Sequence, residues 1–125
     1  MTTFDDREKA FENQYAHAEY QRFLCRARRN KLMGRWAASE LGLNGKAADE
    51  YAEAVCKAGL LKSGDSAILQ KISLDLGRSS RAVPEAELAG RLERLMVEAV
   101  KQLQREPSST TFVAQGSGAQ INPTT

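Results

Sequence analysis

The apolar residues of this chain recur with the spacing of α-helices in four stretches. The first stretch spans residues 3–43, and its apolar stripe is thin up to residue 19 and wider after that. The others span about residues 46–58, 66–76 and 84–105, each with apolar positions three or four residues apart on one face. No stretch alternates with the period of a β-strand. The pattern therefore predicts an all-α protein, a four-helix bundle whose long first helix extends beyond it.

Glycine and proline indicate where these helices end. After the first helix, Asn44 or Gly45 suits a left-handed cap, and Gly77 is expected to end the third helix. Pro84 suits the first position of the fourth helix. Gly34 lies inside the first helix, where glycine costs about 1 kcal/mol relative to alanine. We therefore expect Gly34 to permit a close approach of another helix, or a bend.

Composition divides the chain into three parts. Residues 108–125 carry no charge and few apolar side chains, too few to offset the entropy of ordering them. We expect residues 106–125 to form a disordered tail, residues 20–105 the bundle, and residues 1–19 a separate, mobile N-terminal segment.

The N-terminal segment has an unusual surface. Phe4, Phe11 and Tyr15 share one narrow face of an otherwise polar helix. Such a thin stripe is a poor basis for packing on the chain's own core and a better basis for docking into a partner's groove. The alternative is an ordinary first helix with few core contacts, and the spacing alone does not separate the two.

Charge changes sign along the same helix. Residues 1–19 hold five acids and two bases, a net charge of −3, whereas residues 20–39 hold six bases and no acid. Opposite blocks of charge on one helix indicate a surface that meets another macromolecule. The bases are Arg22, Arg26, Arg28, Arg29, Lys31 and Arg35.

The basic block leaves a second function open. Arginine rows can contact phosphates, so a small basic helical module that binds nucleic acid, or an adaptor, is the alternative to a regulatory protein. The neighbouring acidic block would repel such a polyanion. The basic rows could equally meet carboxylates within the domain, because the second helix is also acidic.

Motifs for catalysis or cofactors are missing from the sequence. It has no Walker A loop, no Rossmann glycines, no HExxH and no GxSxG, so we expect no enzyme and no cofactor. Nucleotide binding by the bundle stays open as an alternative, without a motif to support it. Cys25 and Cys56 fit free thiols in a cytoplasmic protein, and the lone His17 gives no support to a metal site. His17 is also a candidate pH sensor. No apolar run is long enough to span a membrane.

The residues also resemble a known family. FDDREKAFE at residues 4–12, YAH at 15–17, ARRNKL at 27–32 and WAA at 36–38 are similar to the zeta subunit of alphaproteobacterial F-type ATP synthase. The resemblance is close over residues 3–43 and weaker through residue 105.

The resemblance implies a four-helix ATPase inhibitor whose N-terminal segment enters the alpha/beta interface of the catalytic head. There it would meet the alpha, beta and gamma subunits on the cytoplasmic side and block rotation in the hydrolytic direction. The matching partner-binding residues are Phe4, Asp5, Asp6, Arg7, Glu8, Lys9, Phe11, Glu12 and Tyr15. Arg22, Arg26, Arg28 and Arg29 are the expected secondary docking residues.

Overall fold

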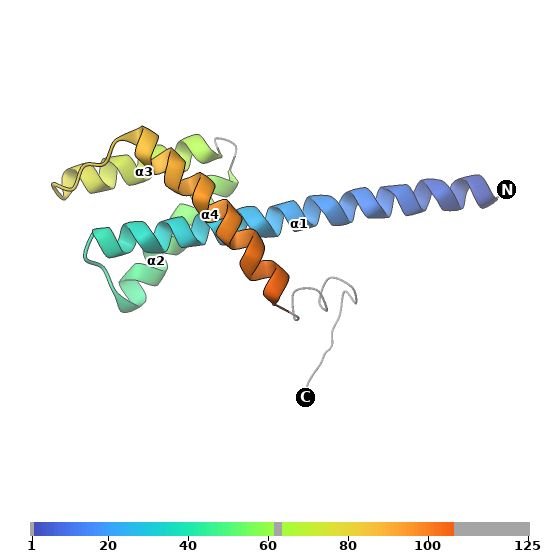
Figure 1. The fold of residues 1–125 in the computed structure, drawn as a ribbon, viewed down its shortest axis with the longest axis horizontal. Coiled ribbons are helices and arrows are strands. Elements are labelled where there is room, and N and C mark those ends of the chain that lie inside the picture. The colour runs from blue at the N-terminus through green and yellow to red at the C-terminus, as the bar shows by residue number, and fades with distance from the viewer. Residues whose placement is uncertain (1, 62–63, 107–125) are drawn as a thin grey trace, which may run out of the picture.

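The computed structural model describes residues 2–61 and 64–106, and side chains from residue 5 onward. This part of the chain forms α1 (Thr2–Glu40), α2 (Gly45–Leu60), α3 (Asp65–Arg78) and α4 (Glu85–Arg105). Figure 1 shows α2, α3 and α4 gathered around the C-terminal half of α1, whose N-terminal half projects away from them. The prediction of an all-α, four-helix fold is confirmed. The predicted disordered tail lies outside the described residues, apart from Glu106.

The core is almost entirely aliphatic. Its fully covered side chains come from all four helices, with Trp36 and Tyr51 packed partly buried against them. Removing apolar surface from water contributes about 25 cal/mol per Å² to the free energy of folding, so this cluster is the main source of stability. The buried cluster consists of Met33, Ala37, Val55, Ile68, Ile72, Leu76, Leu88 and Leu92.

Two glycines bring the helices of the core close together. A Cβ atom on Gly34 of α1 would lie 2.7 Å from the Cα of Ala52 on α2. A Cβ on Gly59 of α2 would lie 2.5 Å from the side-chain nitrogen of Asn30. The predicted role of Gly34 in a close helix approach is therefore confirmed.

The end of α1 differs from the prediction. The left-handed residue after the helix is Gly42, with φ of 80°, and the amide of Leu43 donates to the carbonyl of Ala38 at 2.9 Å. This closing bond is the Schellman arrangement, in which glycine avoids the penalty of a Cβ. Gly45 also has a positive φ, but it is the first residue of α2.

The prediction for the end of α3 was also wrong. Gly77 stays helical, and α3 continues to Arg78. The left-handed residue of this turn is Ser80, with φ of 63°. Pro84 does not occupy the first helical position but directly precedes α4, which begins at Glu85.

Candidate partner-binding surface

The N-terminal part of α1 is a helix that no other described part of the chain covers. Every residue from 5 to 17 is exposed, and Arg29 is the first buried residue among the described side chains. At 1.5 Å per residue, residues 5–17 extend about 20 Å. We call them the projecting segment. The helix runs without a break across the predicted boundary after residue 19, and the division into a 1–19 segment and a body stays a prediction.

The projecting segment carries two large aromatic side chains. Phe11 is 70% exposed and Tyr15 is 63% exposed. They lie four residues apart, so they share one side of the helix. The side chain of Phe4, the third residue of the predicted stripe, is outside the described ones. Exposed aromatics next to charges are typical of protein interfaces.

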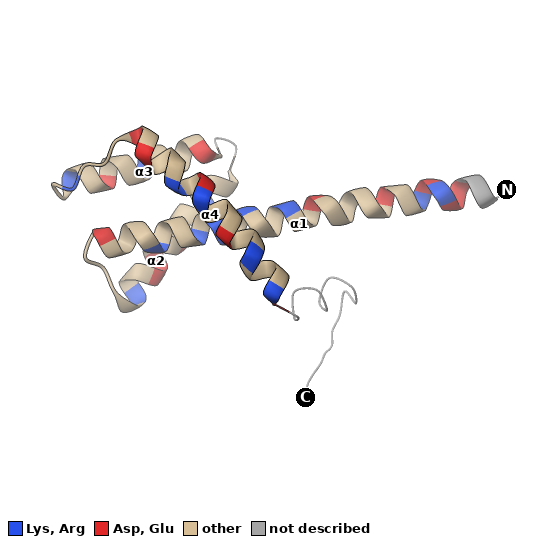
Figure 2. Cartoon of the chain, in the orientation of Figure 1, with Lys and Arg blue, Asp and Glu red and all other residues tan. Residues whose placement is uncertain are grey.

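The charged side chains of this segment have no internal partners. Those at positions 5 to 12 are all exposed, and none forms a hydrogen bond or ion pair with another described residue. They are therefore available to charges on a partner. Figure 2 shows acids and bases side by side near the free end of α1. His17 is also exposed.

The three arginines that share one side of α1, Arg22, Arg26 and Arg29, have different surroundings. Arg22 donates to the carboxylate of Glu19 at 2.6 Å, and this bond lowers the pKa of that exposed carboxyl group. Arg26 is exposed and forms no hydrogen bond or ion pair with any described residue. Arg29 is buried and reaches the carboxylate of Asp65 at 2.6 Å.

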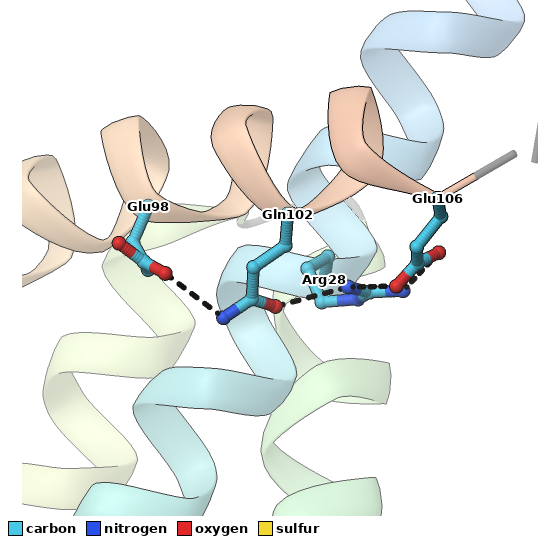
Figure 3. A network of polar contacts seen from close by, with 4 residues as sticks. All are labelled: Arg28, Glu98, Gln102 and Glu106. Carbon is cyan, nitrogen blue, oxygen red and sulfur yellow. Dashed lines mark hydrogen bonds and ion pairs between the residues drawn. The ribbon is translucent and has the colours of Figure 1, made fainter.

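Arg28 is held by the C-terminal end of α4. Its guanidinium donates to the amide oxygen of Gln102 at 2.9 Å and to the carboxylate of Glu106 at 3.1 Å. Gln102 in turn donates to Glu98 at 3.2 Å. Figure 3 shows this chain of contacts, in which Arg28 of α1 lies against three side chains contributed by α4 and the residue that follows it. The network fixes α1 to α4 where α1 leaves the body.

The interpretation that basic residues meet carboxylates within the domain is confirmed for three of them. Arg28 pairs with Glu106, Arg29 with Asp65, and Lys31 with Glu53 of α2 at 3.6 Å. Docking by Arg28 or Arg29 stays a prediction, and it would require these contacts to break. Gln102 and Glu106 were not expected from the sequence, because nothing in their local pattern shows that they face an arginine 74 and 78 residues away.

A cavity of about 370 Å³ lies between α3 and α4. Its floor is aliphatic, and its charged groups are Arg29, Asp65 and Glu93. Because Arg29 is already paired with Asp65, it is not a free cation for an anionic ligand. The remaining lining residues are Leu69, Ala89, Leu92, Met96 and Val97.

The described residues contain no cluster of three or more potential metal ligands. Cys25 and Cys56 are free thiols, and Cys56 donates to the carbonyl of Ala27 at 3.6 Å. Among the residues that the structure places, no helix is long and apolar enough to cross a membrane.

Taken together, the fold and this surface define a helical binding protein that holds one charged, aromatic helix away from its body. Comparison with known families identifies the family to which this protein belongs. The profile of the family described as ATPase inhibitor subunit zeta matches residues 1–102. The chain therefore belongs to the ATPase inhibitor subunit zeta family, a family of inhibitor subunits and not of enzymes.

A solved structure is also similar to this chain. The chain is 41% identical to a protein whose structure was determined by NMR in solution, with a TM-score of 0.56. The similarity covers 66% of this chain and 93% of the other. A comparison with curated proteins finds no match.

Proposed function

We propose that this protein inhibits ATP hydrolysis by ATP synthase by docking the projecting segment of α1 into the catalytic head. The observation that carries the proposal is the exposure of Phe11 and Tyr15 on a helix that nothing else in the described chain covers. Aromatic side chains dominate the binding energy of many interfaces. The membership of the chain in an inhibitor family supports the same partner.

In this proposal the helix enters the interface of the alpha and beta subunits, on the cytoplasmic side and close to the gamma subunit. Phe4, Phe11 and Tyr15 are the apolar anchors. The charged residues between positions 5 and 12 pair with the walls of the interface. Because a helix wedged between subunits opposes their relative movement, it blocks rotation in the hydrolytic direction.

The body has a separate role. Arg28 and Arg29 attach α1 to α4 and to Asp65, so the projecting segment leaves the body in a fixed direction. Arg22 and Arg26 lie exposed between the two parts and are the secondary docking residues. Only Arg26 needs no change of internal contacts to dock, because Arg22 is paired with Glu19. A fixed direction reduces the entropy lost on binding.

The test is ATP hydrolysis by a purified catalytic head, titrated with the wild-type protein and with a Phe4→Ala, Phe11→Ala double variant. We expect the wild type to inhibit and the double variant to lose inhibition. The matched control is Leu74→Ala with Val97→Ala, which removes two exposed apolar side chains of the body and should inhibit as the wild type does. Helix content by circular dichroism should be nearly equal in all three proteins.

Two results would contradict the proposal in different ways. If the wild type leaves hydrolysis unchanged at saturating concentration, inhibition itself is wrong. If the Phe4, Phe11 variant inhibits normally, the protein is an inhibitor but its anchors lie elsewhere.

A further inference from the structure

The aromatic residues of this chain are divided unevenly between its two parts. The sequence holds four Phe, three Tyr and one Trp, and five of these eight lie within the first 23 residues. The described body uses only Trp36 and Tyr51, both partly buried against an aliphatic core. Folding of the body therefore does not explain why α1 carries so many rings.

Two of these rings form a pair outside the projecting segment. Tyr20 and Phe23 stack with their centroids 6.5 Å apart and their planes 16° apart. Tyr20 is 38% exposed and Phe23 is 42% exposed. Stacking holds the two rings in one arrangement, so the apolar surface is already formed before a partner arrives. Preformed surfaces lose less entropy on binding than flexible ones.

The pair faces a different side of α1 from Phe11 and Tyr15. With 3.6 residues per turn, Tyr20 is rotated by about 140° from Tyr15, and Phe23 by about 80°. A partner that covered only the side of Phe11 and Tyr15 would leave the pair in water. A partner that covers all four rings must have walls on two sides of the helix.

We propose that Tyr20 and Phe23 form a second anchor that binds the catalytic head, on a wall different from the one that receives Phe11 and Tyr15. This inference rests on the partner named under the proposed function. The two anchors lie on one unbroken helix, and Phe23 is only about 12 Å along the axis from Tyr15. A head that encloses Tyr15 therefore also reaches the pair.

The size of the interface supports the same conclusion. Stable protein interfaces use about 20 to 30 residues on each side. Residues 4–15 supply twelve, whereas residues 4–23 supply twenty. The longer segment reaches the usual size without any contribution from the body.

A direct binding measurement tests this second anchor. The full-length Tyr20→Ala, Phe23→Ala variant is titrated against a purified catalytic head by calorimetry, and hydrolysis is followed in parallel. We expect the Kd to rise about 30-fold or more, because each buried aromatic anchor contributes at that level. The Leu74→Ala, Val97→Ala protein, which loses two exposed apolar side chains of the body, is the matched control, and its Kd should stay at the wild-type value. The melting temperature of both variants should stay close to that of the wild type.

The outcomes separate this inference from the proposed function. An unchanged Kd for the Tyr20, Phe23 variant overturns the second anchor, even if the wild type inhibits. A wild type that binds without slowing hydrolysis refutes inhibition, while the 30-fold loss still supports the anchor. A wild type that does not bind overturns both.

The other possible occupant of the pair is a second copy of this chain. Light scattering tests for such a dimer. The inference is overturned, and the pair assigned to self-association, if the wild type is a dimer, the Tyr20, Phe23 variant is a monomer and the Kd of that variant for the head is unchanged.

Discussion

Replacing Gly34 by alanine should destabilise the fold, although alanine favours a helix. The new Cβ would lie 2.7 Å from the Cα of Ala52 and 3.0 Å from the Cβ of Val55. The nearest atom belongs to the backbone and cannot rotate away, so α2 has to shift. Such overpacking costs about 1–3 kcal/mol, whereas the gain in helix propensity is about 1 kcal/mol. Since backbone contacts are the hardest to relieve, we expect a net loss of about 1–2 kcal/mol.

The matched control is Gly90→Ala on α4. A Cβ there would meet only the end of the Arg94 side chain, at 3.5 Å, which can move freely. The same chemical change should therefore stabilise the protein by up to about 1 kcal/mol. The two substitutions have equal effects on helix propensity but opposite predicted signs, so any difference between them reports the space between α1 and α2.

Thermal and urea unfolding measure both effects. For a body of this size, 1 kcal/mol shifts the melting temperature by roughly 4–8 °C, so Gly34→Ala should melt several degrees below the wild type and Gly90→Ala slightly above it. The reasoning fails if Gly34→Ala is as stable as Gly90→Ala, because the two helices would then have room for a methyl group.

Two further predictions concern titratable groups. The Tyr51 hydroxyl donates to Asp75 at 2.7 Å, so Tyr51→Phe should lose about 1 kcal/mol in urea unfolding at neutral pH. Burial, and then Asp75, raises the pKa of Tyr51. The stability that this group contributes is therefore complete below about pH 10 and falls as the pH rises further. The wild type should accordingly lose its stability advantage over Tyr51→Phe in alkali, and a stability difference that stays constant with pH would contradict this. Burial also raises the pKa of the Cys56 thiol, so a disulfide reagent should label Cys25 first. Cys25→Ser should then remove the fast phase of labelling. A fast phase that persists in this variant would show that Cys56 is the accessible thiol.

Periodicity was sufficient to predict the four helices, because each helix of the body buries one apolar face. It did not locate the turns. Gly42, Gly45 and Gly77 are equivalent by residue type, yet only Gly42 lies in the turn that closes the end of α1, where its amide donates to the carbonyl of Ser39 at 3.0 Å. Which glycine ends a helix depends on where the apolar face of the next helix must lie, and this is a property of the packed bundle.

The arginines show a similar limit for the candidate surface. The sequence places Arg22, Arg26 and Arg29 in one row, but Arg29 is 6% exposed and the other two are exposed. Helical spacing gives the direction of a side chain but not what lies opposite it. Asp65, which pairs with Arg29, is 36 residues away in the sequence. For Phe11 and Tyr15 the sequence left two alternatives open. Their exposure agrees with a stripe too thin to pack on the body, and their role as partner anchors stays a prediction.

The separation of the rings from the core has a physical consequence for regulation. The buried core cluster is aliphatic, and four of the six described aromatic side chains are exposed on α1. Under the proposed function, changes at these four positions should alter binding with little effect on the free energy of unfolding, since surface substitutions usually change it by less than about 0.5 kcal/mol. Changes in the body act in the opposite way. In that proposal, affinity and stability vary independently, which a helix that shared its rings between core and partner would not allow.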